Sequence, residues 1–158
     1  AHAAREQGEK QRLRRSYGMQ EGQFRRLFER AASGRGVTGE IMLQLLEMRL
    51  DNLVYRMGYA SSRKAARMFV THGHVTVNGR KATIPAMTLK EGDVVAVSGR
   101  KSSRDFATRY IDAAESRGFA PWLKIDKRTL SGEILHIPTR EEISPTIDEQ
   151  LVVELYSK

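Results

Sequence analysis

The sequence has no cysteine among its 158 residues, so disulfide bridges and thiolate metal sites are excluded. It also has no apolar run near the roughly 18 residues that a membrane-spanning helix needs. The chain begins with polar and charged residues (AHAAREQGEKQRLRR), which is not the pattern of a secretory signal peptide. From these absences we expect a cytoplasmic protein that does not bind a membrane.

The patterns of catalytic sites are missing as well. The glycine-rich segment 33–39 (SGRGVTG) has no Lys-Ser or Lys-Thr pair, so it is not a nucleotide-binding P-loop. His72 and His74 form an H-x-H pair without a third ligand, which favours a polar pair that faces RNA over a metal site. Asp51 stands among basic residues, where orienting an arginine or capping a turn is favoured over general-base catalysis. We therefore expect a non-enzymatic binding protein with no catalytic residue, metal, cofactor or small-molecule substrate.

Positive charge is what the sequence has in excess, with a formal net charge of +8 and a pI near 10.0. The charge is unevenly distributed. Residues 1–36 carry nine basic and four acidic side chains, residues 49–104 carry eleven and three, and residues 105–158 carry seven and ten. Such sorting into blocks favours a polyanionic partner, and nucleic acid in particular, over a generally basic surface.

Apolar spacing predicts helices and short strands in succession. The expected helices span residues 21–33, 39–57, 62–73 and 102–116, and the expected strands span 75–77, 81–84, 93–98, 122–126 and 132–137. Asn78-Gly79 predicts a type I′ turn, because this turn needs a positive φ at both central residues. Ser61 or Ser62 is the expected cap of the third helix and Ser103 that of the fourth. The segment after 147 is compatible with a helix or a strand.

These elements predict an α+β fold with two domains. The first is a helical domain made of residues 1–47 and 145–158, in which residues 1–15 are expected to be flexible because they have few apolar anchors. The second, residues 48–144, is an inserted RNA-binding module of two helices packed on a small, mainly antiparallel sheet, with the strands that follow. The terminal segment is the expected packing partner of the N-terminal helices.

The basic side chains of the module predict its RNA-binding face. Arg63, Lys64 and Arg67 share one face of a helix that runs into a glycine-punctuated hairpin, an arrangement suited to a phosphate backbone. Glycines in the turns also let backbone N–H groups approach phosphates. The candidate RNA-binding residues are Arg12, Arg14, Arg15, Arg25, Arg26, Arg49, Asp51, Asn52, Arg56, Ser62, Arg63, Lys64, Arg67, His72, Gly73, His74, Asn78, Gly79, Arg80 and Lys81.

The same region carries a family resemblance. It fits the pattern R-L-D…G…S-R…A…G-x-V-x-V-N-G…G-D at Arg49, Leu50, Asp51, Gly58, Ser62, Arg63, Ala66, Gly73, Val75, Val77, Asn78, Gly79, Gly92 and Asp93. This pattern resembles the small RNA-binding domain named after the bacterial small-subunit ribosomal protein S-four. The resemblance to the ribosomal family itself extends through the segments YGMQEGQFRRLFERA, TGEIMLQLLEMRLDN, RKSSRD, PWLKID and ISPTIDEQLVVELYSK.

The resemblance implies a structural constituent of the small ribosomal subunit. It implies early binding of 16S ribosomal RNA at a multi-helix junction in the five-prime domain, nucleation of subunit assembly, and an influence on decoding accuracy. The implied partners are this RNA, small-subunit ribosomal protein five and, as in some bacteria, the protein's own messenger RNA, which it would repress. Family members normally begin a few dozen residues earlier, with an Arg-rich segment. The resemblance is therefore to an N-terminally truncated or processed member.

Two other functions remain as alternatives. The same domain also occurs in RNA-modifying enzymes, but such an enzyme needs a catalytic domain for which the chain has no room. A free-standing regulator that uses the domain to bind messenger RNA or stalled ribosomes is the second alternative. A panel of RNAs at fixed salt concentration separates these functions, because non-specific attraction to phosphate shows no preference among RNAs.

Overall fold

The computed structural model describes residues 1–143 and 148–157. The chain divides into two compact units. Unit 1 consists of Ala1–Glu47 and Pro138–Lys158, and unit 2 consists of Met48–Ile137. None of the helices in the described residues is long and apolar enough to cross a membrane.

The second boundary between the units differs from the expected one at 144/145. The chain passes into unit 1 at Pro138, whose carbonyl oxygen accepts a hydrogen bond from the side chain of Gln44 at 3.0 Å. A short 3₁₀ helix follows, in which Thr139 and Glu142 form a capping box. The contact of Pro138 with a residue 94 positions earlier assigns this stretch to unit 1, and the sequence near Pro138 carries no local sign of it. Residues 144–147 and 158 of the expected domains lie outside the described residues.

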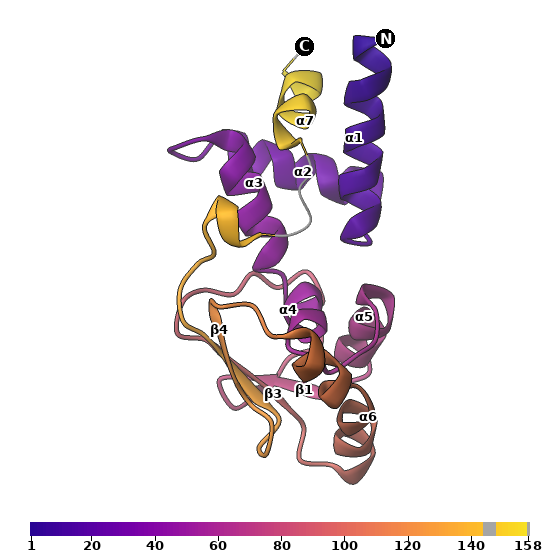
Figure 1. Cartoon of the computed structure of the whole chain (residues 1–158), viewed down its shortest axis with the longest axis vertical. Helices are drawn as coiled ribbons and strands as arrows, with labels where there is room; N and C mark the ends of the chain where they lie inside the picture. Colours follow the sequence, from indigo (N-terminus) through magenta and orange to yellow (C-terminus); the bar gives the residue numbers. More distant parts are fainter. Residues whose placement is uncertain (144–147, 158) are drawn as a thin grey trace. The chain divides into compact units, whose positions relative to one another are not determined.

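Unit 1 is helical in its described residues. Its elements are α1 (His2–Ser16), α2 (Glu21–Ala32), α3 (Thr38–Glu47), η1 (Arg140–Glu142) and α7 (Glu149–Tyr156). Helix α7 packs against α1 and α3, and α2 packs against α3 (Figure 1). The apolar spacing of α2 buries Phe24, Phe28 and Ala31. These residues join the core of the unit with Leu13, Tyr17, Met19, Met42, Leu43, Leu46, Ile143 and Val152.

Residues 1–15, for which the sequence predicts flexibility, form most of helix α1 instead. Leu13 is 1% exposed, and Glu6 and Lys10 are also buried on the inner side of the helix. Beyond its end, the Tyr17 hydroxyl donates a hydrogen bond to the Glu47 carboxylate. The apolar partner of α1 is α7, which lies more than a hundred residues later in the chain. A short apolar stripe is sufficient for order when such a partner is present.

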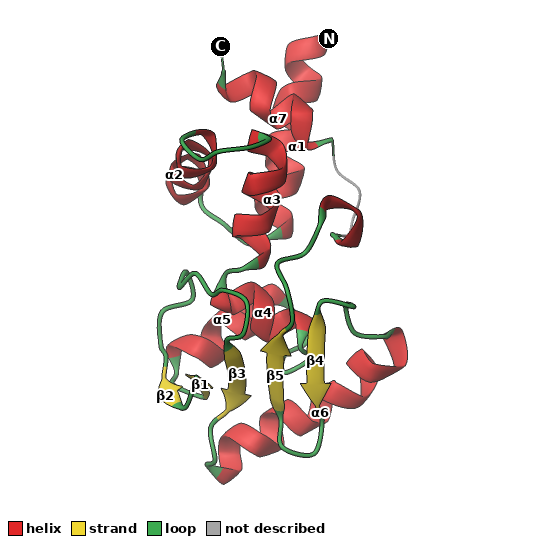
Figure 2. Cartoon of the chain, turned by 90° about the vertical axis from the view of Figure 1, so that its left-hand side faces the viewer, coloured by secondary structure: helices red, strands yellow, loops and turns green. Residues whose placement is uncertain are grey.

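Unit 2 contains three helices and a sheet. Its elements are α4 (Leu50–Arg56), α5 (Arg63–Thr71), β1 (Val75–Val77), β2 (Arg80–Lys81), β3 (Val94–Val97), α6 (Lys101–Arg117), β4 (Leu123–Asp126) and β5 (Ser131–Ile134). The sheet has the order β2-β1-β3-β5-β4, and each neighbouring pair is antiparallel. The three helices lie on one face of the sheet (Figures 1 and 2). The α+β prediction is confirmed.

The helix-covered face of the sheet carries the core of unit 2. Val75 lies opposite Val97 and Val77 opposite Val95, and all four are buried while the residues between them are partly exposed. This is the alternation expected of a sheet with one covered face. Gly132 of β5 lies beneath α4, and a Cβ atom there would be 2.6 Å from the sulfur of Met57. A side chain at 132 would therefore require the end of the Met57 side chain to shift.

The predicted helix over 39–57 is two helices in the structure. The break falls at Arg49, whose backbone is extended (φ −72°, ψ 142°) and forms a β-bridge with Thr88. On either side, the N–H of Leu50 donates to the carbonyl of Met87 at 2.9 Å, and that of Leu89 donates to the carbonyl of Met48. The loop before β3 thus takes hydrogen bonds that a continuous helix would have made internally.

The hairpin turn is confirmed, with φ values of 52° at Asn78 and 83° at Gly79. The return strand β2 is shorter than predicted and ends at Lys81. Ser103 does not cap α6, because the helix begins two residues earlier, at Lys101, and Ser103 is buried inside it. Ser62 does cap α5, and its hydroxyl accepts a hydrogen bond from the N–H of Ala65 at 3.0 Å. The terminal segment, for which helix and strand were both open, is helix α7.

Candidate nucleic-acid interface

Arg49, Asp51 and Asn52 are buried in unit 2, with exposed fractions of 5%, 4% and 1%. The Arg49 guanidinium donates to both carboxylate oxygens of Asp51, at 3.1 and 3.0 Å. Asp51 also accepts a hydrogen bond from the backbone N–H of Asn52 at 2.7 Å. Each charge of the pair therefore has its partner inside the fold, which is the condition for burying charges at all. These residues support the interface from behind and do not form its outer surface.

Asn52 connects this buried pair to helix α5. Its side-chain oxygen accepts a hydrogen bond from Nε of Arg63 at 3.0 Å. The guanidinium group of Arg63 also lies over the ring of Tyr55, 4.7 Å from its centroid. A stacked and hydrogen-bonded guanidinium loses little conformational freedom on binding a phosphate. Helix α4 thus positions the first arginine of α5.

Helix α5 presents a basic face opposite its apolar one. Ala66, Phe69 and Val70 are buried, whereas Lys64 is exposed and Arg67 is partly exposed. We call Arg63, Lys64 and Arg67 the α5 basic face. The sequence pattern predicted this separation, and the structure places all three side chains on the same short helix. Arg56, at the end of α4, is partly exposed.

The hairpin that follows is held rigidly against β3. The Asn78 side chain donates to Asp93 at 2.9 Å and accepts from the N–H of Val94 at 2.9 Å. Burial would raise the pKa of the Asp93 carboxyl, but hydrogen bonds from Asn78 and from the backbone of Lys90 outweigh it and lower that pKa. Asn78 is therefore occupied within the fold. Arg80 is the exposed basic residue at the tip of this rigid hairpin.

A second basic group surrounds Gly73, just after α5. The position of a Cβ atom on Gly73 would be 2.9 Å from the amine of Lys81, so the lysine lies against the bare glycine backbone. Nη2 of Arg100 donates to the carbonyl of Gly73 at 3.0 Å. His72 and His74 flank the glycine, with ring centroids 6.4 Å apart. We call His72, His74, Lys81 and Arg100 the Gly73 cluster.

Two family models match the chain. Residues 48–95 match the S4 domain, and residues 1–47 match the Ribosomal protein S4/S9 N-terminal domain. Proteins named small ribosomal subunit protein uS4 are 49% identical to this chain in Akkermansia muciniphila and 46% identical in Thermus thermophilus, each over 150 residues. These alignments cover 95% of this chain and 74% and 72% of the two relatives. The chain belongs to the uS4 family.

A third uS4 relative, from Geobacter metallireducens, is 52% identical over 150 residues, which cover 95% of this chain and 72% of the relative. These matches confirm the resemblance drawn from the sequence. The S4 domain match begins at Met48, the first residue of unit 2, and includes α4, α5 and the hairpin. The candidate residues of unit 2 thus all lie within the matched S4 domain. Arg100 and helix α6 lie beyond it.

The remaining candidate residues of this uS4 chain lie in unit 1. Arg14 and Arg25 pair with the carboxylates of Glu21 and Glu29. Arg15 and Arg26 are exposed. No ion pair with a carboxylate is formed by these last two within the described part of the chain.

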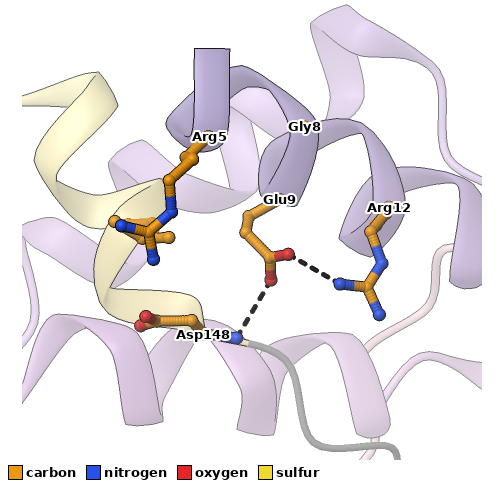
Figure 3. Close-up of a pocket in the computed structure, with 6 residues that line it drawn as sticks. Arg5, Gly8, Glu9, Arg12 and Asp148 are labelled. Atoms are coloured by element: carbon orange, nitrogen blue, oxygen red, sulfur yellow. Dashed lines mark hydrogen bonds and ion pairs between the residues drawn. The ribbon is translucent and has the colours of Figure 1, made fainter. Parts of the chain in front are cut away.

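Arg12 lies at the rim of a hollow between α1 and the start of α7 (Figure 3). It donates to Glu9 at 2.6 Å, and the other carboxylate oxygen of Glu9 accepts from the backbone N–H of Asp148 at 3.1 Å. Figure 3 shows Glu9 between these two partners, with Arg5 on the other side of the hollow. The charge of Arg12 is therefore partly neutralised by its own unit.

Two features of the structure were not predicted from the sequence. Arg100 joins the Gly73 cluster from a position 27 residues after the glycine, and the only sequence signal was its place in the RKSSRD segment. In unit 1, one ligand atom each of His2, Glu6 and Glu154 lie within 4.8 Å of one another, the single such grouping within the residues described. His2 lies 3.4 and 3.3 Å from the two carboxylates, so a protonated histidine ion-paired with both gives the same spacing.

Proposed function

We propose that this uS4 chain is a structural, non-enzymatic constituent of the small ribosomal subunit in the cytoplasm, and that it binds 16S ribosomal RNA through unit 2. Two findings support the first part, namely the family match over both units and the shared name of the relatives. The second part draws support from the S4 domain and from the basic side chains that this domain exposes.

The observation that carries the RNA-binding proposal is the exposed positive charge of unit 2. Within the residues that the structure describes, Lys64, Arg80 and Lys81 make no ion pair with a carboxylate. Among the described residues, the one partner of the Arg100 side chain is the backbone carbonyl of Gly73. Neighbouring cations without counter-charges repel one another, and a polyanion that joins them removes this repulsion and releases its own counterions.

The finer features of the proposed function follow from the family. They are binding at a multi-helix junction in the five-prime domain of the RNA, nucleation of subunit assembly, and an influence on decoding accuracy. Small-subunit ribosomal protein five is the proposed protein partner, and the chain's own messenger RNA is the proposed target of repression. A free-standing regulator with the same domain is less well supported, because residues 1–47 match a ribosomal N-terminal domain.

The test is a panel of RNAs bound at one stated salt concentration. The panel contains the five-prime domain of 16S ribosomal RNA, the leader of the chain's own messenger RNA, and an unrelated duplex of equal length. The proposal predicts a preference for the ribosomal RNA, whereas equal binding to all three would contradict it. A preference for the messenger leader alone would favour the regulator.

A variant with alanine at Arg63, Lys64 and Arg67 locates the interface. It should fold, because the buried side of α5 is unchanged, and it should bind the ribosomal RNA more weakly. The log–log salt dependence of its affinity should be flatter by about 0.7 to 0.9 for each phosphate that is no longer bound. An unchanged affinity and salt dependence would remove α5 from the interface. The matched control replaces Arg104, Arg109 and Arg117 of α6, which lowers the net charge equally.

A further inference from the structure

Gly73 lies where three segments of unit 2 meet. The end of α5 supplies His72, β2 supplies Lys81, and the residue before α6 supplies Arg100. The amine of Lys81 lies against the glycine backbone, and the Arg100 guanidinium is bonded to the glycine carbonyl. One cationic group therefore donates a hydrogen bond to Gly73, and a second lies in the space that a Cβ atom on this residue would occupy.

The frame beneath these cations is rigid. The His74 ring stacks on Phe69 with centroids 4.8 Å apart, and Phe69 stacks on Phe106 of α6 at 4.9 Å. Nδ1 of His74 is 2.7 Å from the hydroxyl of Ser103, which is fully buried in the first turn of α6. The N-terminal end of α6, where a helix carries partial positive charge, is thereby fixed beside the cluster.

The charged groups of the Gly73 cluster are all positive. Burial lowers the pKa of His74, and the positive charges of Arg100, His72 and Lys81 lower it further. These are the charged or titratable groups that face His74 from α5, β2 and the segment before α6, while α6 itself contributes the neutral Ser103. Within the described residues, no carboxylate pairs with His72, Lys81 or Arg100. The cluster is thus a fixed positive site without a counter-charge.

We propose that the Gly73 cluster is a seat for one phosphate group of an RNA backbone, with Arg100 and Lys81 as its principal ligands and His72 at its rim. The proposal deepens the proposed function and rests on it, because it names where unit 2 holds one phosphate and adds Arg100 to the interface. A guanidinium provides paired donors for phosphate oxygens, and an ammonium provides a compact point charge. The Lys81 side chain can lie beside residue 73 because glycine has no side chain, and a Cβ atom there would displace the lysine.

The first experiment uses the full chain and inorganic phosphate, followed by NMR at constant ionic strength with chloride as the reference. Shifts should concentrate on His72, Gly73, His74 and the side chains of Lys81 and Arg100. The variant R100Q/K81Q should lose these shifts. It should keep its melting temperature, because both side chains are exposed. The matched control R109Q/K124Q removes two other exposed cations from α6 and β4 and should keep the shifts.

The histidines provide an independent readout. Bound phosphate favours the protonated ring, so saturation with phosphate should raise the pKa of His74 from its lowered value. Phosphate affinity should accordingly increase as the pH falls through this range. In R100Q/K81Q the pKa of His74 should be higher than in the parent without phosphate, because two of the three depressing charges are gone. Addition of phosphate should not change the pKa of His74 in this variant.

The second experiment separates this proposal from the proposed function. At fixed salt concentration, R100Q/K81Q should bind the five-prime domain RNA about tenfold more weakly than R109Q/K124Q does. Equal affinity of the two variants, or phosphate shifts spread evenly over the surface lysines, would overturn the seat and leave the proposed function standing. If the parent binds phosphate at the cluster but shows no preference for the ribosomal RNA, the seat stands and the proposed function fails.

Discussion

The two units of the chain use their positive charge differently. In unit 1, Lys10 and Arg14 pair with Glu21, Arg12 with Glu9 and Arg25 with Glu29, whereas Arg15 and Arg26 form no such pair within the described residues. In unit 2, Arg49 pairs with Asp51 inside the fold, whereas Lys64 and Arg80 have no carboxylate partner within the described residues. The net charge of a segment therefore does not locate a surface for a polyanion. Such a surface is indicated by exposed cations that have no carboxylate partner in their own unit.

The first prediction concerns the paired cation of unit 2, where the largest effect is expected. Asp51→Ala leaves the Arg49 guanidinium buried without its counter-charge, which should reduce the free energy of unfolding by about 3–5 kcal/mol. Asp105→Ala, in an exposed pair with Lys101, should leave that free energy nearly unchanged. Chemical denaturation of both variants provides the measurement. A small loss for Asp51→Ala would mean that water reaches Arg49 and that the pair is not part of the core.

The second prediction tests whether α1 belongs to the core of unit 1. Leu13→Ala removes a side chain that is 1% exposed and should reduce the free energy of unfolding of unit 1 by about 2–5 kcal/mol. Val37→Ala, at a side chain that is 60% exposed, is the control and should have little effect. Hydrogen exchange followed by NMR reports on each unit separately. If both variants lose equally little free energy of unfolding, α1 is not packed in unit 1. The ion pairs of its arginines would then not hold in solution.

The third prediction compares paired and unpaired cations directly. K64Q/R80Q removes two unpaired charges from unit 2, and R12Q/R25Q removes two paired charges from unit 1. At fixed salt, the first variant should bind the ribosomal RNA about tenfold more weakly, with a salt dependence reduced by about 1.4 to 1.8 because two phosphates are no longer bound. The second should show a smaller loss in filter binding. Equal losses would show that RNA competes successfully for the paired arginines too.

The fourth and smallest effect concerns acid. The folded pKa of Asp93 lies below its ordinary value of 3.8, so the carboxylate contributes stability that is complete above this pH and is lost as the pH falls through the lowered pKa. The free energy of unfolding should therefore fall less between about pH 5 and about pH 2 in Asp93→Asn than in the parent. Denaturation midpoints across this range are the measurement. If the stability of the variant depends on pH as that of the parent does, the charge of Asp93 does not contribute to holding the hairpin against β3.

Local features of the fold could be predicted from the sequence. The hairpin turn depends on Asn78 and Gly79 alone, and the cap of α5 depends on Ser62 and a residue three positions later. The α5 basic face also follows from helical periodicity within one short segment. These predictions agree with the structure because all of the interactions that decide them lie within a few residues of one another.

Non-local features could not be predicted. The helix break at Arg49 depends on a bridge to Thr88, and the order of α1 depends on α7. Likewise, Ser103 has the residue type of a helix cap but is bonded to His74, 29 positions earlier. In the site, the sequence named Arg49 as a candidate RNA-binding residue and favoured Asp51 as a residue that orients an arginine, but it gave no sign that the two are buried together. The sequence thus predicted an RNA-facing role for Arg49, whereas the structure buries its guanidinium group.

The placement of α1 against α7 has a consequence for the order in which the protein forms. Met48–Ile137 is a continuous stretch that can fold as a unit while the polypeptide is still being made. Helix α1 is synthesised before unit 2, yet its packing partner α7 (Glu149–Tyr156) follows unit 2, so α1 cannot pack against α7 until that helix has been made. A nascent chain therefore exposes Leu13 and the rest of this apolar stripe until α7 has been made. Deletion of residues 149–157 would leave unit 2 whole and α1 without its partner.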